Sequence, residues 1–337
     1  MKIAVVSIMF KQTPPPAYGG IERVVYNLVE ALVRGGHEVV MFATPGSYCS
    51  GKTVVVPAYD PARAPSGIIK KSDAVSEEPL YETMREYLRE NPVDVIHDWS
   101  FESLFVRRHP EDFPFIVSTC IPPPPDFRRR NLVACSRAHA RLCGGTTKYV
   151  YYGLDLESYR YDFEKEEHFI HISKIARYKG QHLAILAAVR SGSRLAVAGN
   201  VEDKAYYYGV IRPLTFLFPK YVSYIGELHG TNDALRRARA LIQTPRWFDA
   251  FPLVILEAFA SGTPVIALGE GGIPEQIDPG INGYLCKSTG DIADAMENIG
   301  RIDPRICRQY AEERYRAERM AADYINLYHQ VRDGDGW

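Results

Sequence analysis

The stretch from Arg246 to Leu285 limits the fold of this 337-residue chain more than any other part of it. Pro252 suits the first position of a helix, because its fixed φ and missing N–H cost nothing there. Apolar side chains follow it at helical spacing, at Val254, Ile255, Ala258 and Phe259. The β-branched run Pro264–Leu268 then predicts a buried parallel strand, and Gly271-Gly272 predicts a turn. A helix followed directly by a buried strand indicates an α/β fold with a parallel sheet.

Two acids accompany the predicted helix. Asp249 comes just before it, and Glu257 lies inside it among apolar neighbours, where an unpaired carboxylate is rare. The free amides at the helix start, those of Leu253 and Val254, attract anions together with the helix dipole. The carboxylates can accept hydrogen bonds from sugar hydroxyls, so the combination predicts a ligand with both a phosphate and a sugar. The alternative is structural: a dipole-favoured acid at Asp249 and a buried hydrogen-bonding residue at Glu257.

Strands and helices alternate in two halves along the chain. In the first half, the predicted strand Lys2–Ser7 leads through Gly19-Gly20 into a helix that ends near Arg34. The glycine pair is either a plain tight turn or a phosphate contact. It does not form GxGxxG, so a nicotinamide-dependent dehydrogenase is disfavoured. The second half restarts with the predicted strand Phe169–Ser173, and the chain length fits two domains.

Three cations crowd the loop after that strand: Lys174, Arg177 and Lys179. They form either a solvated basic loop or a clamp for a diphosphate, because cations near a helix start act together with its dipole. Beside Lys179, either Lys174 or Arg177 supplies the second cation of such a clamp.

Composition restricts the partners. The formal net charge is −1, so bulk electrostatics give no reason to expect nucleic-acid binding. The cysteines follow no CxxC or zinc spacing, so we expect free thiols and no metal site. The N-terminus enters a strand directly, without a signal peptide, and no apolar run reaches transmembrane length. We therefore expect a cytoplasmic protein without a transmembrane segment, with peripheral membrane association and the oligomeric state left open.

These motifs resemble the nucleotide-sugar site of glycosyltransferase family 4, whose pattern is an acid, a spacer, Glu-Ala, then Gly-x-Pro-Val and a Gly-Gly/Ser-x-Pro-Glu turn. The chain matches this pattern with Glu257-Ala258, Gly262-x-Pro264-Val265 and Gly271-Gly272-x-Pro274-Glu275. Lys179-Gly180 fits the basic loop of the family. The string PPPAYGGIERVV resembles the first loop of one subgroup, in which the glycine turn faces the donor diphosphate.

The resemblance covers nearly the whole chain and implies the GT-B fold, with two Rossmann-like, doubly wound parallel-sheet α/β domains facing each other across a cleft. It implies an acceptor-side domain at residues 1–160 and a nucleotide-sugar-binding domain at 161–311. A C-terminal helix, 312–332, crosses back to the first domain. The implied activity is that of a retaining, metal-independent glycosyltransferase without a cofactor. Such an enzyme moves a hexose from a nucleotide diphosphate sugar, UDP-glucose-like in the family, to an acceptor hydroxyl.

The resemblance also implies roles for single residues. Lys179, with Lys174 or Arg177, holds the donor diphosphate. Glu257 accepts from the ribose and Asp249 from the donor sugar. His97, at the end of a predicted strand, is the further catalytic candidate. The remaining donor contacts expected are Gly19, Gly20, Trp99, Phe251, Leu253 and Val254.

The acceptor is not identified by these motifs. In the family, acceptor pockets are formed by variable loops of the first domain, which correspond here to Met9–Tyr18, Ala58–Pro79 and Pro122–Phe127. The donor base and sugar are equally open beyond the family preference.

Four positions depart from the family pattern. Asp249 replaces Glu and Pro252 replaces Gly, while Trp99 and Cys120 stand where histidines are usual. The shorter acid reaches less far, and proline donates no N–H. His97 is a single histidine at a strand end, which is more often structural than catalytic. Two alternatives therefore stay open: a nucleotide-sugar-binding protein that has lost catalysis, and a GT-B sugar epimerase.

Overall fold

The computed structural model describes residues 1–17, 19–56, 76–122, 129–144 and 146–337. The chain divides into two compact units: Met1–Gly153 with Ala317–Trp337 form unit 1, and Leu154–Arg316 form unit 2. The sequence analysis put the corresponding boundaries at 160/161 and 311/312. Of the loops expected to bind the acceptor, Tyr18 and most of the other two segments lie outside the described residues.

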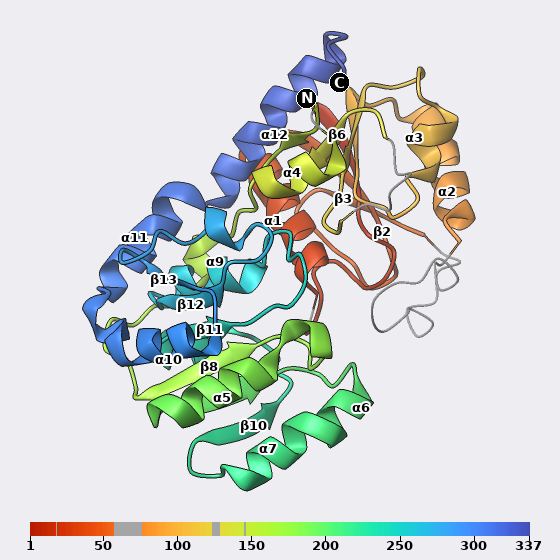
Figure 1. Cartoon of the computed structure of the whole chain (residues 1–337). Helices are drawn as coiled ribbons and strands as arrows, with labels where there is room; N and C mark the ends of the chain where they lie inside the picture. Colours follow the sequence, from red (N-terminus) through yellow and green to blue (C-terminus); the bar gives the residue numbers. More distant parts are fainter. Residues whose placement is uncertain (18, 57–75, 123–128, 145) are drawn as a thin grey trace. The chain divides into compact units, whose positions relative to one another are not determined.

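Unit 1 is built on a sheet in which all neighbouring strands are parallel (Figure 1). Its order in the described residues is β3-β2-β1-β4-β5-β6-β7. The strands are β1 (Lys2–Val6), β2 (Glu38–Ala43), β3 (Lys52–Val55), β4 (Val95–Asp98), β5 (Phe115–Ser118), β6 (Leu132–Ala134) and β7 (Lys148–Tyr149). The chain starts in the middle of the sheet and winds outward in both directions, so this sheet is doubly wound, as predicted. In such sheets ligands bind at the carboxyl ends of the strands.

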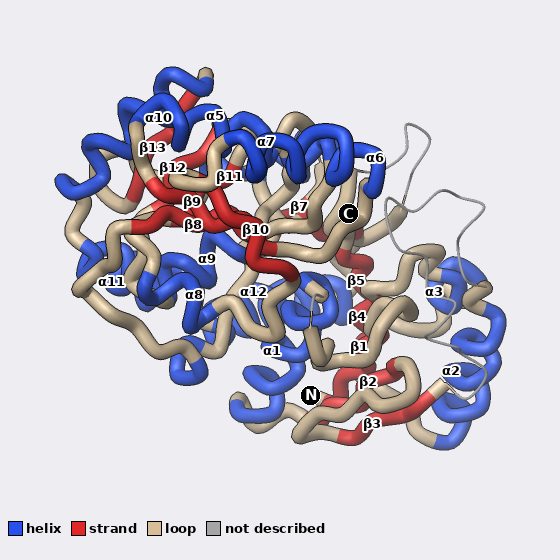
Figure 2. The backbone as a smooth tube through the Cα atoms, turned by 90° about the horizontal axis from the view of Figure 1, so that it is seen from below, coloured by secondary structure: helices blue, strands red, loops and turns tan. Residues whose placement is uncertain are grey.

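Helices cover both faces of this sheet. Figure 2 shows its strands between α1 and α12 on one side and α2 and α3 on the other. The helices of unit 1 are α1 (Gly20–Arg34), α2 (Glu78–Glu90), α3 (Leu104–Arg108), α4 (Arg137–Cys143) and α12 (Ala317–Arg332). Ser136 caps α4, because its hydroxyl accepts from the amide of His139 at 3.1 Å.

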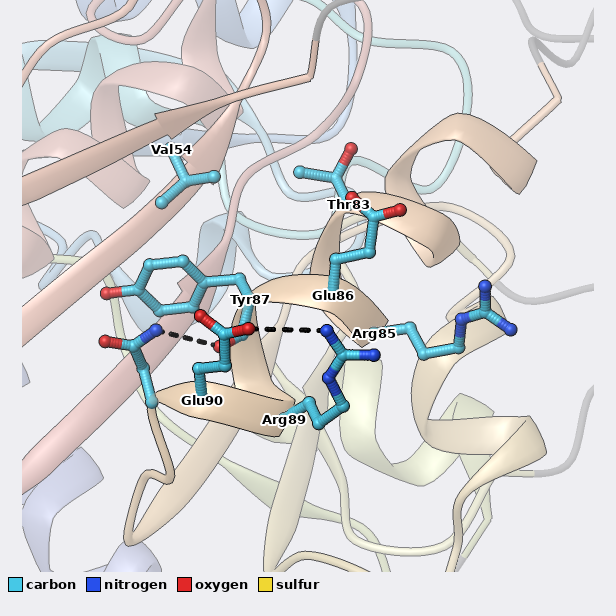
Figure 3. Close-up of a pocket in the computed structure, with 8 residues that line it drawn as sticks. Val54, Thr83, Arg85, Glu86, Tyr87, Arg89 and Glu90 are labelled. Atoms are coloured by element: carbon cyan, nitrogen blue, oxygen red, sulfur yellow. Dashed lines mark hydrogen bonds and ion pairs between the residues drawn. The ribbon is translucent and has the colours of Figure 1, made fainter.

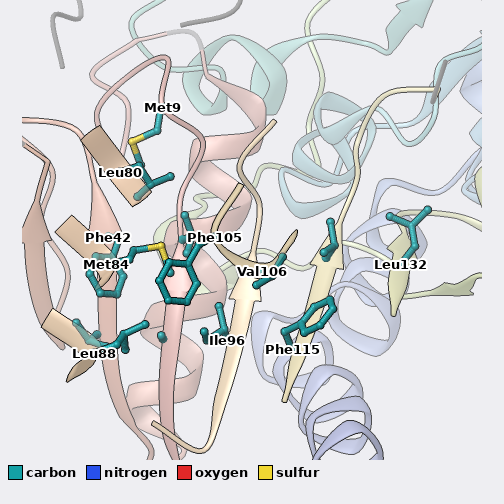
Figure 4. Close-up of a cluster of buried hydrophobic side chains, with 14 of the residues drawn as sticks. Met9, Phe42, Leu80, Met84, Leu88, Ile96, Phe105, Val106, Phe115 and Leu132 are labelled. Atoms are coloured by element: carbon teal, nitrogen blue, oxygen red, sulfur yellow. The ribbon is translucent and has the colours of Figure 1, made fainter. Parts of the chain in front are cut away.

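One buried apolar cluster of unit 1 lies between α2, α3 and the sheet (Figure 4). Leu80, Met84 and Leu88 recur every four residues of α2, so they form one apolar stripe on that helix. The stripe packs with Phe42 of β2 and Ile96 of β4, and all five side chains are buried. Each fully buried side chain of this size contributes about 1.5–3 kcal/mol. The stripe therefore fixes α2 on the sheet.

Unit 2 repeats the architecture with a second parallel sheet, ordered β10-β9-β8-β11-β12-β13 in the described residues. The strands are β8 (His168–Ile172), β9 (Arg194–Ala198), β10 (Val222–Gly226), β11 (Leu241–Gln243), β12 (Val265–Leu268) and β13 (Gly283–Cys286). The α-helices are α5 (Gln181–Ser191), α6 (Lys204–Tyr206), α7 (Arg212–Leu217), α8 (Asn232–Arg237), α9 (Leu253–Ala260), α10 (Thr289–Asn298) and α11 (Pro304–Arg314). Short helical turns are η3 (Leu156–Ser158), η4 (Arg177–Lys179), η6 (Ile273–Glu275) and η7 (Ile299–Arg301), and η5 (Tyr207–Ile211) is a π-helical turn between α6 and α7.

The C-terminal helix does not run continuously through residues 312–332, so that prediction is wrong at its start. α11 ends at Arg314 and α12 begins at Ala317. Between them, Tyr315 is buried, and its ring packs against Phe251 with the centroids 6.1 Å apart. Its carbonyl accepts from the amide of Leu154 at 2.7 Å, which turns the backbone away from the helical path. α12 then packs on α1 and β5 of unit 1, so the last helix returns to the first unit as expected.

Candidate functional site

A lysine and an aspartate meet at the carboxyl end of the unit 2 sheet. Lys179 ends the turn η4, which follows β8, and Asp249 lies in the loop after β11, the strand next to β8. The Nζ atom of Lys179 is 2.5 Å from Oδ2 of Asp249. Their side chains are only 16% and 12% exposed, so bulk water screens this pair less than a surface pair. Two residues predicted to hold one ligand are thus direct neighbours.

Aromatic rings flank this pair. The Nζ atom of Lys179 lies 5.4 Å from the ring centroid of Trp247 and 5.7 Å from that of Tyr178. The two rings pack edge to face, with their centroids 5.1 Å apart. Such contacts add cation–π attraction and hold the lysine in one direction. Neither ring was predicted as part of the site, because a single aromatic residue in a loop carries no local signal.

Glycine is required where the basic loop enters α5. Gly180 has φ +68°, and a Cβ built on it would lie 2.0 Å from the carbonyl oxygen of Thr244. The close approach places Lys179 beside the loop after β11, since Thr244 directly follows that strand. Gly180 therefore helps to position Lys179, because it allows this close packing of the two backbones.

The loop that carries Asp249 is held from the other side by the glycine turn after β12. The amide of Gly272 donates to the Asp249 carbonyl at 2.8 Å. Gly271 has φ +61°, and a Cβ there would lie 2.1 Å from the same carbonyl oxygen. The sequence analysis predicted a turn at this glycine pair. In the structure its close approach is to the backbone of Asp249, so the turn fixes the acid.

Helix α9 begins one residue later than predicted. Pro252 has ψ 117° and is the N-cap, so Leu253 is the first helical residue. Gln276 donates from Nε2 to the Pro252 carbonyl at 3.2 Å, which anchors this start to the turn after β12. No side chain caps α9, and the amides of Leu253 and Val254 belong to the first turn, where helical amides have no partner within the helix. Phe251 is buried against Tyr315, so its side chain serves packing.

Glu257 is buried in α9 and bound by two hydroxyl groups. Its Oε1 accepts from the hydroxyl of Tyr159 at 3.1 Å, and its Oε2 accepts from the hydroxyl of Thr231 at 3.0 Å. Only 5% of the residue is exposed. Tyr159 and Thr231 were not predicted, since each lies far from Glu257 in the sequence. Each oxygen of this carboxylate thus accepts from one hydroxyl, as it could from two neighbouring hydroxyls of a sugar.

Lys174 and Arg177 separate in the structure. The Nζ atom of Lys174 lies 2.7 Å from Oε2 of Glu202, whose Oε1 accepts from the hydroxyl of Tyr178 at 2.9 Å. The guanidinium of Arg177 instead lies over the ring of Tyr206, 5.4 Å from its centroid. Lys174 thus shares an arrangement with Lys179: each lysine of the loop after β8 pairs with a carboxylate from a neighbouring loop.

Glu202 is a member of the site that sequence reasoning missed. It lies in the loop after β9, which pairs with β8. The amide of Ile175 donates to the carbonyl of Asn200 at 2.8 Å, which brings the two loops together. No motif marks Glu202, because its place depends on the strand order and not on its neighbours in the chain.

In unit 1, His97 is enclosed. Its Nδ1 lies 2.7 Å from the hydroxyl of Tyr328, and its Nε2 lies 2.8 Å from the hydroxyl of Ser118. The residue has no exposed surface, and burial lowers its pKa well below the usual value, so the ring is neutral. A neutral ring donates from one nitrogen and accepts at the other. With both nitrogens engaged inside unit 1, the geometry favours the structural role for His97.

Trp99 and the glycine pair lie at the carboxyl ends of neighbouring strands in the same unit. Trp99 is 2% exposed and packs against His97, with ring centroids 5.0 Å apart. Its indole N–H has no hydrogen-bond partner among the described residues. Gly19 is the N-cap of α1 and Gly20 its first residue, and no side chain caps this helix. A Cβ on Gly20 would meet nothing within 4 Å.

A pocket of about 720 Å³ opens between α2 and β3 of unit 1 (Figure 3). Two of its lining residues, Arg89 and Glu90, form an ion pair at 3.3 Å. None of the predicted site residues lines it. Within the described part of the chain, no group of three or more His, Cys, Asp and Glu residues is arranged to hold a metal ion. In the same residues, no helix is long and apolar enough to span a membrane.

The two parallel-sheet units match the GT-B fold of solved glycosyltransferases. AviGT4, a glycosyltransferase involved in avilamycin A biosynthesis, is 26% identical, with a TM-score of 0.79 over 100% of this chain and 99% of that chain. Sucrose-phosphate synthase from Thermosynechococcus elongatus gives a TM-score of 0.78 at 17% identity, covering 99% of each chain. HepE from Anabaena, solved in complex with UDP and glucose, has a TM-score of 0.69 at 16% identity. The match covers 98% of this chain and 99% of that chain.

Two family models match the sequence. Glycosyltransferase Family 4 matches residues 18–141, and Glycosyl transferases group 1 matches residues 160–314. The chain therefore belongs to the glycosyltransferases of family 4. D-inositol 3-phosphate glycosyltransferase of Mycobacterium tuberculosis is 35% identical over 120 residues, which cover 35% of this chain and 24% of that protein. The matched part thus spans about a quarter of the length of these curated relatives.

Proposed function

We propose that the chain is a retaining glycosyltransferase that moves a hexose from a UDP-glucose-like donor to an acceptor hydroxyl without a metal ion or cofactor. The observation that carries the proposal is the pair of Lys179 and Asp249, three residues before the Pro252 cap of α9. Asp249 and the first-turn amides of α9 are close in the chain, and the ion pair adds the cation Lys179 to them. The UDP and glucose bound by HepE support this class of donor.

Binding of the donor exchanges partners at each of these groups. Lys179 leaves Asp249 for a diphosphate oxygen, and the amides of Leu253 and Val254 donate to the same group. This cluster stabilises the negative charge that develops on the leaving diphosphate. Asp249, released from its lysine, accepts from hydroxyls of the donor sugar. Lys174 makes the same exchange from Glu202, so the resting ion pairs keep both cations in place without a ligand.

Glu257 supplies the grip on the ribose. Tyr159 and Thr231 already donate hydroxyl hydrogen bonds to it, and ribose hydroxyls would take over that role. Each hydrogen bond from a hydroxyl to the buried carboxylate contributes about 1.5–3 kcal/mol to binding. We expect the reaction to take place in the cytoplasm.

The experiment is a donor screen with the purified chain. Release of UDP is measured for a panel of UDP-sugars offered with simple alcohols as hexose acceptors, with and without a chelator, and the anomeric configuration of the glycoside formed is read by NMR. We expect one UDP-hexose to give UDP release that the chelator does not change, with the anomeric configuration kept. Release that requires an added divalent cation, or inverted product, would contradict the mechanism.

A second candidate function is nucleotide-sugar binding without catalysis. It is favoured by Trp99, which fills buried space where a histidine is usual in the subgroup. Calorimetric binding of a UDP-sugar with no release of UDP for any acceptor would support it. The same purified chain tests the epimerase alternative. An epimerase would change the configuration of the sugar in a labelled donor with no acceptor present.

A further inference from the structure

One surface of unit 2 combines exposed aromatic and aliphatic side chains with cations. It is formed by the continuous helical segment α6, η5 and α7, which covers β10, the edge strand of the sheet (Figure 1). Tyr206 and Ile211 point inward and are buried. Outside them, Phe216 is 84% exposed and Leu217 is 64% exposed. Exposed large apolar side chains next to each other mark a surface that contacts something else.

The exposed residues of this segment recur at a regular interval. Every fourth residue is exposed and the members alternate between cation and aromatic ring, in the order Lys204, Tyr208, Arg212, Phe216 and Lys220. We call these five residues the cation–aromatic stripe. The guanidinium of Arg212 lies 5.8 Å from the ring centroid of Tyr208, so these two members form a cation–π contact. Residues four apart in a helix are neighbours on its surface, so successive members from Lys204 to Phe216 lie side by side, and Lys220 follows the end of α7 at Leu217.

The charge of this surface has one sign. Residues 204–226 contain three cations and no Asp or Glu, although the whole chain has 41 acids in 337 residues. Among the described residues, the three cations of the stripe form no ion pair, whereas both lysines of the donor loop do. The stripe is thus a positive surface, with the exposed Phe216 and its neighbour Leu217 between Arg212 and Lys220.

We propose that the cation–aromatic stripe docks unit 2 on the surface of an anionic lipid bilayer. Lysine and arginine attract anionic headgroups, tyrosine suits the headgroup level, and phenylalanine with leucine enters the acyl boundary. In this arrangement Phe216 and Leu217 insert, while Lys204, Arg212 and Lys220 lie at the phosphate level. The docking is independent of the donor site and goes beyond the transfer reaction.

A second copy of the chain fits this surface less well. In a twofold contact the stripe would face itself, so three cations would meet three cations. A nucleic acid would satisfy the cations but would leave Phe216 and Leu217 exposed or stacked without an insertion site. A bilayer with anionic lipids matches both the charge and the exposed apolar pair Phe216 and Leu217.

The test is co-sedimentation of the full chain with vesicles. Phosphatidylcholine vesicles are compared with vesicles that also contain phosphatidylglycerol, at low and at high salt. We expect the anionic vesicles to bind at least about tenfold more protein at low salt, and salt to reduce that binding. Equal binding to both vesicle types, or binding to neither, would overturn the proposal.

Variants assign the binding to the stripe. Phe216→Ser with Leu217→Ser removes the insertion, and Lys204→Glu with Arg212→Glu and Lys220→Glu removes the charge. Each set should lower binding about tenfold or more while the circular dichroism spectrum and thermal transition stay unchanged. A matched control changes an exposed leucine and arginine elsewhere in unit 2, Leu186→Ser with Arg194→Glu, and should bind like the wild type. Wild-type binding by either stripe set would contradict the assignment.

Two further readouts separate the occupants. The Phe216→Trp variant should be quenched by brominated lipids more strongly than the parent chain, because insertion brings the new indole to the acyl boundary. Sedimentation equilibrium without vesicles should give the same mass for the wild type and the Phe216→Ser, Leu217→Ser variant. A self-association that this variant abolishes, with no vesicle binding, would show that the stripe is a protein interface and would refute membrane docking.

Discussion

Lys179 and Asp249 are 70 residues apart in the chain, yet their charged atoms lie 2.5 Å from each other in a site with little exposure. Lys174 and Glu202 form a second such pair in the adjacent loops. In the proposed reaction each lysine exchanges its carboxylate for a phosphate oxygen. The resting pairs therefore have two effects: they hold the lysines in position, and they compete with the donor.

The first prediction concerns this competition. Lys179→Ala should reduce turnover of the UDP-sugar by at least about tenfold, since a charge-assisted contact is worth roughly 1.5–3 kcal/mol. Lys287→Ala removes an exposed lysine of unit 2 and should leave turnover unchanged. Steady-state UDP release, measured on variants with native circular dichroism, checks both. Turnover of folded Lys179→Ala at the wild-type level would remove this lysine from the site.

The second prediction concerns Glu257. Glu257→Ala should weaken UDP binding about tenfold or more, because two hydroxyl hydrogen bonds to a carboxylate are lost. Tyr159→Phe and Thr231→Val each remove a hydroxyl that donates to Glu257 but keep the carboxylate. Each should lower the free energy of unfolding by about 1 kcal/mol without weakening UDP binding. Isothermal titration with UDP measures the binding. The role in ribose recognition is refuted if Glu257→Ala binds UDP like the wild type.

The third prediction tests the backbone of the basic loop. Gly180 and Gly192 flank α5 with φ values of +68° and +69°, but only at Gly180 does a Cβ meet a backbone oxygen. Gly192→Ala should cost roughly 1 kcal/mol for the left-handed backbone alone. Gly180→Ala should cost clearly more, since either the basic loop or Thr244 must shift, and turnover should fall as well. Thermal denaturation of both variants checks this, and equal losses would contradict the packing argument.

The fourth prediction is a pH effect in unit 1. Glu77 is buried and accepts from the hydroxyl of Ser100 and the amides of Glu102 and Leu104. Burial, with the charge of Asp98 nearby, raises the pKa of Glu77 to about 7 from 4.5. The folded state therefore binds the proton more tightly than the unfolded state. This contribution to stability is full below about pH 4.5 and is lost as the pH rises to about 7.

Glu77→Gln should flatten that pH dependence. The change in unfolding free energy across the window is on the order of 2–3 kcal/mol at 1.36 kcal/mol per pKa unit. Glu78→Gln is the control, because Glu78 is exposed and its pKa is lowered by Arg108. Urea unfolding in a Trp247→Phe background makes the remaining tryptophans, Trp99 and Trp337, report on unit 1. An unchanged slope between pH 4.5 and 7 in Glu77→Gln would contradict the prediction.

Local patterns were sufficient for the elements. Apolar spacing and the residues at helix starts predicted α1, α9 and the strands beside them, because these depend on residues a few positions apart. The same patterns failed at the C-terminus. Tyr315 suited a continuous helix by spacing, but its contacts with Phe251 and Leu154 interrupt that helix, and these partners lie far along the chain.

The sequence by itself determined the α/β fold, the family and the short list of cations and acids around Lys179-Gly180 and Glu257. The tertiary structure decided which of these groups meet. β8 lies between β9 and β11, so the two lysines after β8 face one acid from each side, Glu202 after β9 and Asp249 after β11. Strand order in a parallel sheet follows from the packing of whole βαβ units, and no local spacing encodes it. For this reason Asp249 was recognised by its motif, while Glu202, Tyr159 and Thr231 became visible only in the folded chain.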